Sequence, residues 1–266
     1  MKTNIFKLLK NDNIKIINKL IIDKNSIYYI LKHVNIEMVD ILQKLKSLNN
    51  YLIYEPLDIE WKEMLLHKYL NKIKDKLLLF DHIICNNTHI LNLYREICPK
   101  LHYTTIYHEY DMRFKPEYNP RDMVVYIGSL GKSSLTNMIC MTHNIVVITP
   151  DNSFINNNHT CIHIDYIKHN TTYYHLHTAT KLATALCFNS IFITNRVPVY
   201  VELLGTDYEF YINDDLSDLA KIINKAKHYI AHSEQYNNYI EKVKLIKKKL
   251  WYKNVINDYA NLFTSV

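Results

Sequence analysis

Glycine is almost absent from this chain, which has only three glycines in 266 residues. Glycine adopts backbone conformations that other residues avoid, and it lets a ligand or another segment come close. Two of the three, Gly128 and Gly131, lie together in the segment VVYIGSLGKSS. We therefore expect this segment to need its glycines for a turn or for a close approach.

Two glycine-dependent phosphate motifs are excluded by one residue. The Walker-type loop G-x-x-x-x-G-K-[ST] would use Gly131-Lys132-Ser133, and the dinucleotide fingerprint G-x-G-x-x-G would use Gly128 and Gly131. Both need a glycine at position 126, where this chain has Tyr126. A strand, a glycine turn and a helix N-terminus can still form a phosphate site. The simpler alternative, a tight βα connection with no ligand, stays open.

Paired cysteines and long apolar runs are also missing. The five cysteines are an odd number and form no C-x-x-C pair, which favours reduced thiols in the cytosol over a disulfide framework. No stretch reaches the ~20 apolar residues that cross a bilayer, and the N-terminus lacks a signal-peptide pattern. The net charge of +6 permits an anionic ligand but falls short of a nucleic-acid-binding surface. We expect a cytoplasmic protein with no transmembrane segment and no nucleic-acid partner.

Short apolar runs alternate with amphipathic segments, which is typical of parallel sheets flanked by helices. Residues 1–50 have a mostly helical pattern, and Asn86-Asn87-Thr88 is expected to cap a helix. The predicted strands are 51–54, 82–85, 101–107, 124–127, 145–149, 161–164, 190–194 and 210–212. The predicted helices are 36–48, 61–78, 89–97, about 133–142, 178–189, 216–230 and 234–262.

The polar segment DMRFKPEYNPRD divides the chain into two α/β halves. We predict an N-terminal α/β domain at 1–112, a linker at 113–122 and a Rossmann-like domain at 123–245. A C-terminal helix at 246–266 could cross back to the N-terminal half. At ~110 residues, the N-terminal half is short for a full domain of this kind.

Five segments carry a resemblance through their order and spacing. They are FDHIICNNT (80–88), IYHEYDMRF (106–114), VYIG (125–128), KLATALCFNSIFI (181–193) and VELLG (201–205). They resemble the GT-B glycosyltransferases of the family 4/1 type, in which two Rossmann-like halves face a cleft that holds a nucleotide-sugar donor. The resemblance implies that fold here, with a reduced acceptor-side half at the N-terminus and a donor-binding second half. The chain departs from the family pattern at Asn189, where a glycine is usual, at Ile191 in place of proline, and in lacking the E-x7-E pair.

The resemblance also implies a reaction and its residues. A glycosyltransferase would move a sugar from a nucleotide-sugar donor to a glycan or another hydroxyl acceptor, with no metal and no cofactor. Backbone N–H groups near Gly128 and Ser129, a helix N-terminus and Lys181 would neutralise the leaving diphosphate. A general base would come from His108, Glu109 or Asp111. The implied donor-side residues are Gly128, Ser129, Tyr174, Thr180, Lys181 and Glu202.

Two rival functions and one rival site stay open. The chain could be an atypical P-loop nucleotide-binding protein that uses Gly131-Lys132-Ser133. It could instead be a non-catalytic GT-B-like protein that binds a glycan or another partner. His163, His169, His175 and His177 could bind zinc together with Asp165. In a chain with 14 histidines such a cluster is expected by chance, and we predict no metal.

Overall fold

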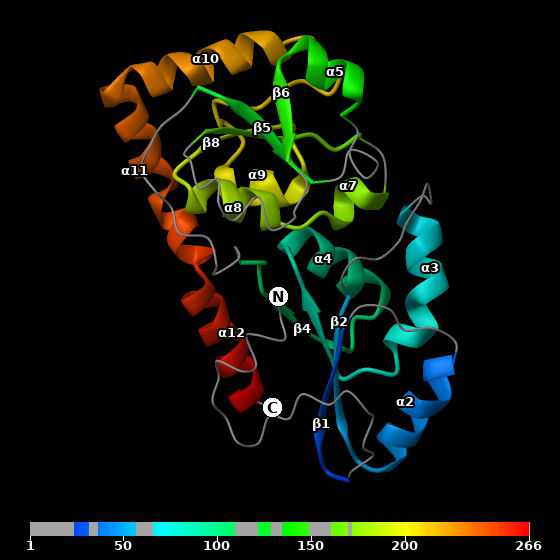
Figure 1. Cartoon of the computed structure of the whole chain (residues 1–266). Coiled ribbons are helices and arrows are strands. Elements are labelled where there is room, and N and C mark those ends of the chain that lie inside the picture. Colours follow the sequence, from blue (N-terminus) through cyan, green and yellow to red (C-terminus); the bar gives the residue numbers. More distant parts are fainter. Residues whose placement is uncertain are drawn as a thin grey trace. The chain divides into compact units, whose positions relative to one another are not determined.

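The computed structural model describes residues 24–31, 37–56, 66–109, 122–128, 135–148, 161–169 and 172–265. These residues form two compact units. The first contains the described residues up to Tyr107 together with those from Val255 onward, and the second runs from His108 to Asn254. Each unit is built on a parallel sheet of four described strands (Figure 1).

The sheet of the first unit is wound in one direction. Its strands lie side by side in chain order: β1 (Ile27–Leu31), β2 (Tyr51–Glu55), β3 (His82–Cys85) and β4 (His102–Thr105). The described helices between them are α2 (Glu37–Ser47), α3 (Leu66–Leu77) and α4 (Thr88–Ile97). Parallel crossovers are right-handed, so steps in a constant direction place the connecting helices on the same face. The opposite face of the sheet then needs another cover.

The last helix, α12 (Tyr252–Ser265), supplies that cover. Its side chains Val255, Tyr259 and Leu262 form one buried cluster with Ile53, Ile84 and Ile106 from the sheet. Figure 1 shows α2 and α3 on one side of this sheet and α12 on the other. Burying a large apolar side chain contributes about 1.5–3 kcal/mol. The C-terminal helix is therefore part of the core of the first unit.

The sheet of the second unit reverses its direction of winding. Its strand order is β6-β5-β7-β8, with bounds Val124–Ile127 (β5), Ile145–Ile148 (β6), Ile162–Asp165 (β7) and Ile191–Thr194 (β8). The chain moves from β5 to β6 on one side and then crosses to β7 on the other side. In open parallel sheets, ligands bind outside the carboxyl ends of the strands at such a switch point. Here the switch point lies at the carboxyl ends of β5 and β7.

Six described helices complete this unit. They are α5 (Asn137–Thr142), α7 (Thr172–Leu176), α8 (Thr180–Cys187), α9 (Pro198–Leu204), α10 (Leu219–Ala231) and α11 (Ser233–Lys249). Within the described ranges, no helix combines the length and the apolar composition that a bilayer crossing needs. All five cysteines are buried and unpaired.

Most of the predicted elements are confirmed. The strands at 82–85 and 124–127 have the predicted bounds, and the other predicted strands before residue 195 differ only at their ends. The predicted cap is also present, because Asn87 Oδ1 accepts the Ile90 N–H at 2.8 Å. Helix α3 begins at Leu66, and the earlier part of its predicted range lies outside the described residues.

Three predictions of secondary structure are wrong. Residues 27–31 form β1 instead of continuing a helical pattern, because IYYIL pairs in register along the whole of β2. Residues 210–212 make a single bridge between Thr194 and Tyr211 instead of a strand. The predicted helix 234–262 is broken into α11 and α12. At the break, Asn254 Nδ2 donates to the Lys248 carbonyl at 2.5 Å, in competition with the helix ladder, at the point where the chain passes between units.

Asparagine takes the place that glycine usually has at the ends of helices. Four of the five described non-glycine residues with positive φ are asparagines, and three of these, Asn49, Asn144 and Asn189, follow the helices α2, α5 and α8. Asn189 follows α8 with φ 55°, and the N–H groups of Asn189 and Ser190 donate to Leu186 and Ala185 at 3.1 and 2.9 Å. These are the two bonds of a Schellman cap, which needs a left-handed residue. Asn189 therefore supplies the conformation for which the family pattern uses glycine.

Candidate functional site

A buried carboxylate lies at the switch point of the second sheet. Asp165 is the last residue of β7 and is fully buried. Its Oδ1 accepts from Lys181 Nζ at 2.6 Å, and its Oδ2 accepts from the Tyr200 hydroxyl at 2.7 Å. His177 Nε2 lies 2.9 Å from the same Oδ2. A buried carboxylate is tolerated only when it is paired and hydrogen-bonded in this way.

Lys181 is the cation of this cluster and is the second residue of α8. Its Nζ donates to the Tyr126 hydroxyl at 3.0 Å and lies 4.2 Å from the centre of the Tyr126 ring. An ammonium has three N–H donors, and Asp165 and Tyr126 take two of them. Among the described residues, the third has no acceptor, while 24% of the Lys181 side chain is exposed. The ammonium can therefore donate to one more negative or polar group of a ligand.

The charges of this pair are fixed by their contact. Burial alone would raise the pKa of Asp165, but the Lys181 ammonium and His177 outweigh it and hold that pKa well below its usual range. Burial alone would lower the pKa of Lys181, but the Asp165 carboxylate outweighs it and raises that pKa above its usual value. The pair is therefore an ammonium and a carboxylate at neutral pH.

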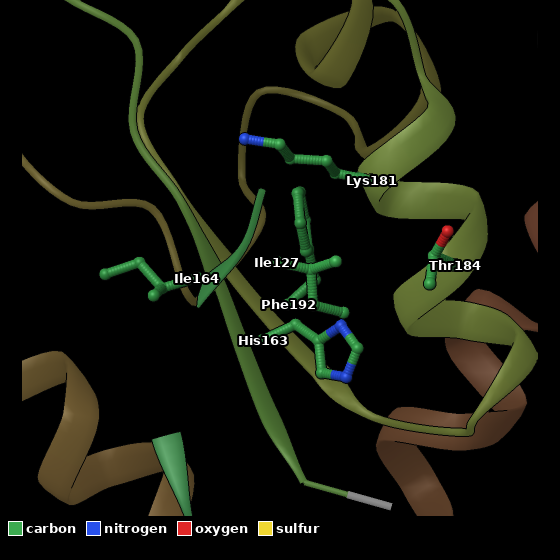
Figure 2. A pocket seen from close by; sticks show the side chains of 6 residues that line it. All are labelled: Ile127, His163, Ile164, Lys181, Thr184 and Phe192. Atoms are coloured by element: carbon green, nitrogen blue, oxygen red, sulfur yellow. The ribbon is translucent and has the colours of Figure 1, made fainter. Parts of the chain in front are cut away.

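A small cavity lies beneath Lys181 (Figure 2). Ile127, His163, Ile164, Thr184 and Phe192 line it together with Lys181, and its volume is about 20 Å³. Figure 2 shows Lys181 at one end and His163 at the other. A cavity of this size holds about one water molecule. A ligand of Lys181 therefore has to lie outside the cavity. Burial lowers the pKa of His163 to about 3, so its ring is neutral near pH 7.

The N-terminus of α8 carries donors of its own. Its first residues are Thr180 and Lys181, and no side chain caps the helix at Ala179. The first N–H groups of a helix have no partner within the helix, and they favour a negative charge. The first backbone amides of α8 and the Lys181 ammonium thus lie in the same first turn of this helix.

Two of the predicted site residues meet at this turn. His108 Nδ1 lies 3.3 Å from Thr180 Oγ1, and the Thr178 and Thr180 hydroxyls lie 3.0 Å apart. His108 and Thr180 both belong to the second unit. Glu109, the next residue, is buried. The structure thus brings His108 close to Thr180, which precedes Lys181, although His108 and Thr180 are 72 residues apart in sequence.

The glycine of the predicted phosphate turn is used differently from the expectation. Gly128 has φ 141°, a conformation that favours glycine. Its N–H donates to the Ile148 carbonyl at 2.9 Å, so the sheet already uses this donor. A Cβ at this position would lie 3.1 Å from the Tyr126 hydroxyl. Gly128 thus shapes the turn next to Tyr126. Ser129, Gly131 and Asp111 lie outside the described residues.

Two other predicted donor residues have different surroundings. Tyr174 is buried, its hydroxyl donates to the Arg196 carbonyl, and its ring centre lies 4.8 Å from that of His169. Burial, with a contribution from Asp214, raises the pKa of Tyr174 to about 12. Glu202 is exposed on α9. Tyr174 has the packing of a core side chain.

Sequence reasoning missed most of the cluster around Lys181. The sequence pointed to Asp165 and His177 only as members of the rival zinc site, and to Tyr126 only as the residue that excludes two motifs. The signal for Asp165 was its place as a carboxylate at the carboxyl end of the predicted strand 161–164. Tyr200 has no comparable signal, because nothing in its neighbourhood marks it off from the 22 tyrosines. Among the described residues, no group of three or more His, Cys, Asp or Glu side chains could hold a metal ion.

Comparisons with known proteins find structural likeness only. No family model and no curated protein matches this chain. The crystal structure of a GtfA/B complex matches 89% of this chain and 57% of its own, with a TM-score of 0.51 and 8% identity. The pneumococcal O-GlcNAc transferase GtfA in complex with UDP and GlcNAc matches 89% and 56%, with a TM-score of 0.49 and 11% identity. Accessory secretory protein 1, 2 and 3 of Streptococcus pneumoniae matches 89% and 54%, with a TM-score of 0.44 and 12% identity.

The first of these matches bears on the fold. It confirms the predicted fold class, an α/β chain with two Rossmann-like halves of the GT-B type. The chain spans less than two thirds of the length of the structure it matches.

Proposed function

We propose that this chain is a glycosyltransferase that takes a sugar from a nucleotide-sugar donor, and that the donor diphosphate binds at Lys181. The GT-B type fold supports a glycosyltransferase-like function. The position of Lys181 supports the more specific proposal of a diphosphate site. Its ammonium contacts Asp165 at the carboxyl end of β7, beside β5, where open parallel sheets bind ligands.

One observation carries the proposal: the Lys181 ammonium has one N–H with no acceptor among the described residues, and it stands at the start of α8, which no side chain caps. A departing diphosphate gains negative charge as the sugar leaves, and preorganised donors at that position lower the barrier. Lys181 supplies a full positive charge, and the first amides of α8 add partial positive charges. No step in this scheme calls for a metal ion.

His108 is the member of the proposed base set that lies near these donors. Its contact with Thr180 places an imidazole at the start of α8, where it can reach the donor sugar or its phosphate. Glu109 and Asp111 stay candidates for the general base. The acceptor is a glycan or another hydroxyl compound, and we propose that the protein acts in the cytoplasm, as its unpaired cysteines suggest.

The proposal is tested by nucleotide binding. Wild type and Lys181→Met are titrated calorimetrically with UDP, GDP, ADP and ATP, in EDTA and again in magnesium. We expect a diphosphate to bind in EDTA and Lys181→Met to weaken that binding at least tenfold. Lys225→Met is the matched control, because Lys225 also pairs with a carboxylate, Glu209 at 3.4 Å, and lies over the Phe210 ring.

The other outcomes separate the rival functions. Binding of ATP that requires magnesium and is insensitive to Lys181→Met would favour the atypical P-loop protein. No response to any nucleotide would favour a non-catalytic protein that binds a glycan or a partner. Equal affinity of wild type and Lys181→Met for the diphosphate would contradict the assignment of Lys181.

A further inference from the structure

We propose that Asp165 is the positioning residue of this site, which holds the Lys181 ammonium in place for a diphosphate that binds without a metal. The inference rests on the proposed function and adds a residue that the resemblance does not supply. Asp165 would not touch the donor. It would act through Lys181, with Tyr200 and His177 holding the carboxylate from the other side.

The geometry favours this role over that of an ordinary ion pair. Both partners lie close to the carboxyl ends of parallel strands, but Asp165 is fully buried while 24% of the Lys181 side chain is exposed. The carboxylate of this ion pair therefore lies in the core, and the ammonium lies nearer the surface, where a ligand can reach it. A salt bridge that served the fold alone would not need part of the ammonium surface exposed, nor an N–H without an acceptor among the described residues.

The same contacts commit the Asp165 carboxylate to groups of the protein. A carboxylate that holds a metal for a diphosphate has to be reachable from the ligand side, and Asp165 is fully buried. Asp165 Oδ1 holds the ammonium, and Oδ2 is shared by the Tyr200 hydroxyl and His177. The carboxylate is therefore used to orient a cation that is part of the protein. The diphosphate meets Lys181 in place of a divalent ion.

The polar groups that face Lys181 come from two strands. Asp165 comes from β7 and Tyr126 from β5, while His163 of β7 lies in the cavity beneath. Removing the Asp165 charge leaves a largely buried ammonium with a phenol and a neutral imidazole around it. Burial then favours the neutral amine, and the pKa of Lys181, now raised by Asp165, falls.

Two readouts on Asp165→Asn test the proposal. The first is affinity for UDP and for inorganic pyrophosphate in EDTA from pH 7 to 10. We expect at least a tenfold loss at pH 7, and a further loss on the alkaline side at a pH where wild type still binds. The second needs no ligand: the rate at which acetyl N-hydroxysuccinimide modifies Lys181 at pH 8, followed by mass spectrometry. We expect at least a tenfold faster modification in the variant.

Two variants keep the test specific. Glu209→Gln removes the carboxylate beside Lys225 and should leave both readouts at Lys181 unchanged. Tyr200→Phe keeps the ring and removes one donor to Asp165, so it should weaken binding less than Asp165→Asn does. Circular dichroism and thermal melts show whether each variant is folded, and the labelling rate is compared with that of Lys225 in the same sample.

The outcomes distinguish this inference from the proposed function. Diphosphate binding that Asp165→Asn leaves unchanged, or an unchanged rate of Lys181 modification, overturns the role of Asp165. If wild type binds neither UDP nor pyrophosphate, the proposed function fails. In that case faster labelling of Lys181 in Asp165→Asn would still support the coupling of these two residues.

Discussion

The Tyr259 hydroxyl donates to both carboxylate oxygens of Glu55, at 3.0 and 2.8 Å, across 204 residues of sequence. Glu55 ends β2 and is buried, and Tyr259 comes from the middle of α12. Tyr29 of β1 donates to the same carboxylate. A buried carboxylate that loses a donor costs more free energy than an exposed one, because water cannot replace the lost bond.

Tyr259→Phe should therefore destabilise the protein although it removes a single oxygen atom. We expect a loss of about 1.5–3 kcal/mol, the range for hydrogen bonds to charged groups. Urea unfolding followed by circular dichroism measures it. Tyr252→Phe on the same helix is the control, because no buried carboxylate contact is described for it. If Tyr259→Phe lowers the free energy of unfolding by less than Tyr252→Phe does, the Glu55 carboxylate does not need the Tyr259 hydroxyl for stability.

The alternation of elements was predictable from the sequence because most strands here are buried on both faces. Runs such as Val124–Ile127 and the first three residues of β8 are continuously hydrophobic, as parallel strands should be. β1 was missed because IYYIL follows a long stretch of helical pattern, and its strand form depends on pairing with β2. The break between α11 and α12 falls where the chain leaves the second unit, and α12 then packs in the core of the first unit. Local pattern contains neither piece of information.

Asparagine at left-handed positions leads to a stability prediction. Asn144 follows α5 with φ 51°, a conformation that costs roughly 1–2 kcal/mol for most residues and little for glycine. Asn144→Ala should destabilise the protein by about 1 kcal/mol, and Asn144→Gly should be neutral or slightly stabilising. Chemical denaturation measures both. Asn238→Ala in the exposed middle of α11 is the control and should not destabilise, because alanine favours helix. Equal stability of the two Asn144 variants would contradict the argument.

The candidate site was only partly predictable. Lys181 stood out because a lysine in the first turn of a helix opposes the helix dipole, and the structure places it in that turn. Its partners Asp165 and Tyr126 come from β7 and β5, and the partners of Asp165 come from α9 and the segment after α7, so only the folded chain brings them together. The order of strands around β5 decides which ends form the switch point. Sequence gives the strands but not that order.

Burial of His163 predicts acid sensitivity of the fold. Its pKa is lowered to about 3 in the folded state by burial, against about 6.5 in the unfolded chain. Between these values the unfolded chain binds a proton that the folded protein excludes, so stability falls as the pH drops below about 6.5. One such group contributes a slope of up to about 1.4 kcal/mol per pH unit. His163→Gln should reduce the slope of the free energy of unfolding between pH 6.5 and 4, measured by urea titration at each pH.

Two comparisons check that prediction. His228→Gln alters an exposed histidine and should leave the slope unchanged. The pKa of His82 is lowered to about 4 by burial and by His102. His163→Gln should therefore retain part of the dependence of the free energy of unfolding on pH. Parallel curves for wild type and His163→Gln across this range would show that His163 is not excluded from protonation in the folded state.

Gly128→Ala tests whether the turn after β5 needs its glycine. The φ of 141° is disfavoured for alanine, and the new Cβ would lie 3.1 Å from the Tyr126 hydroxyl. The backbone strain should cost about 1–3 kcal/mol, and Tyr126 has to shift, which disturbs its bond to Lys181. We therefore expect lower stability in urea together with faster acetylation of Lys181. Combining it with Tyr126→Phe removes the close oxygen but not the strained φ, so only part of the stability should return. Full recovery in the double variant would show that crowding, and not backbone conformation, selects glycine at this position.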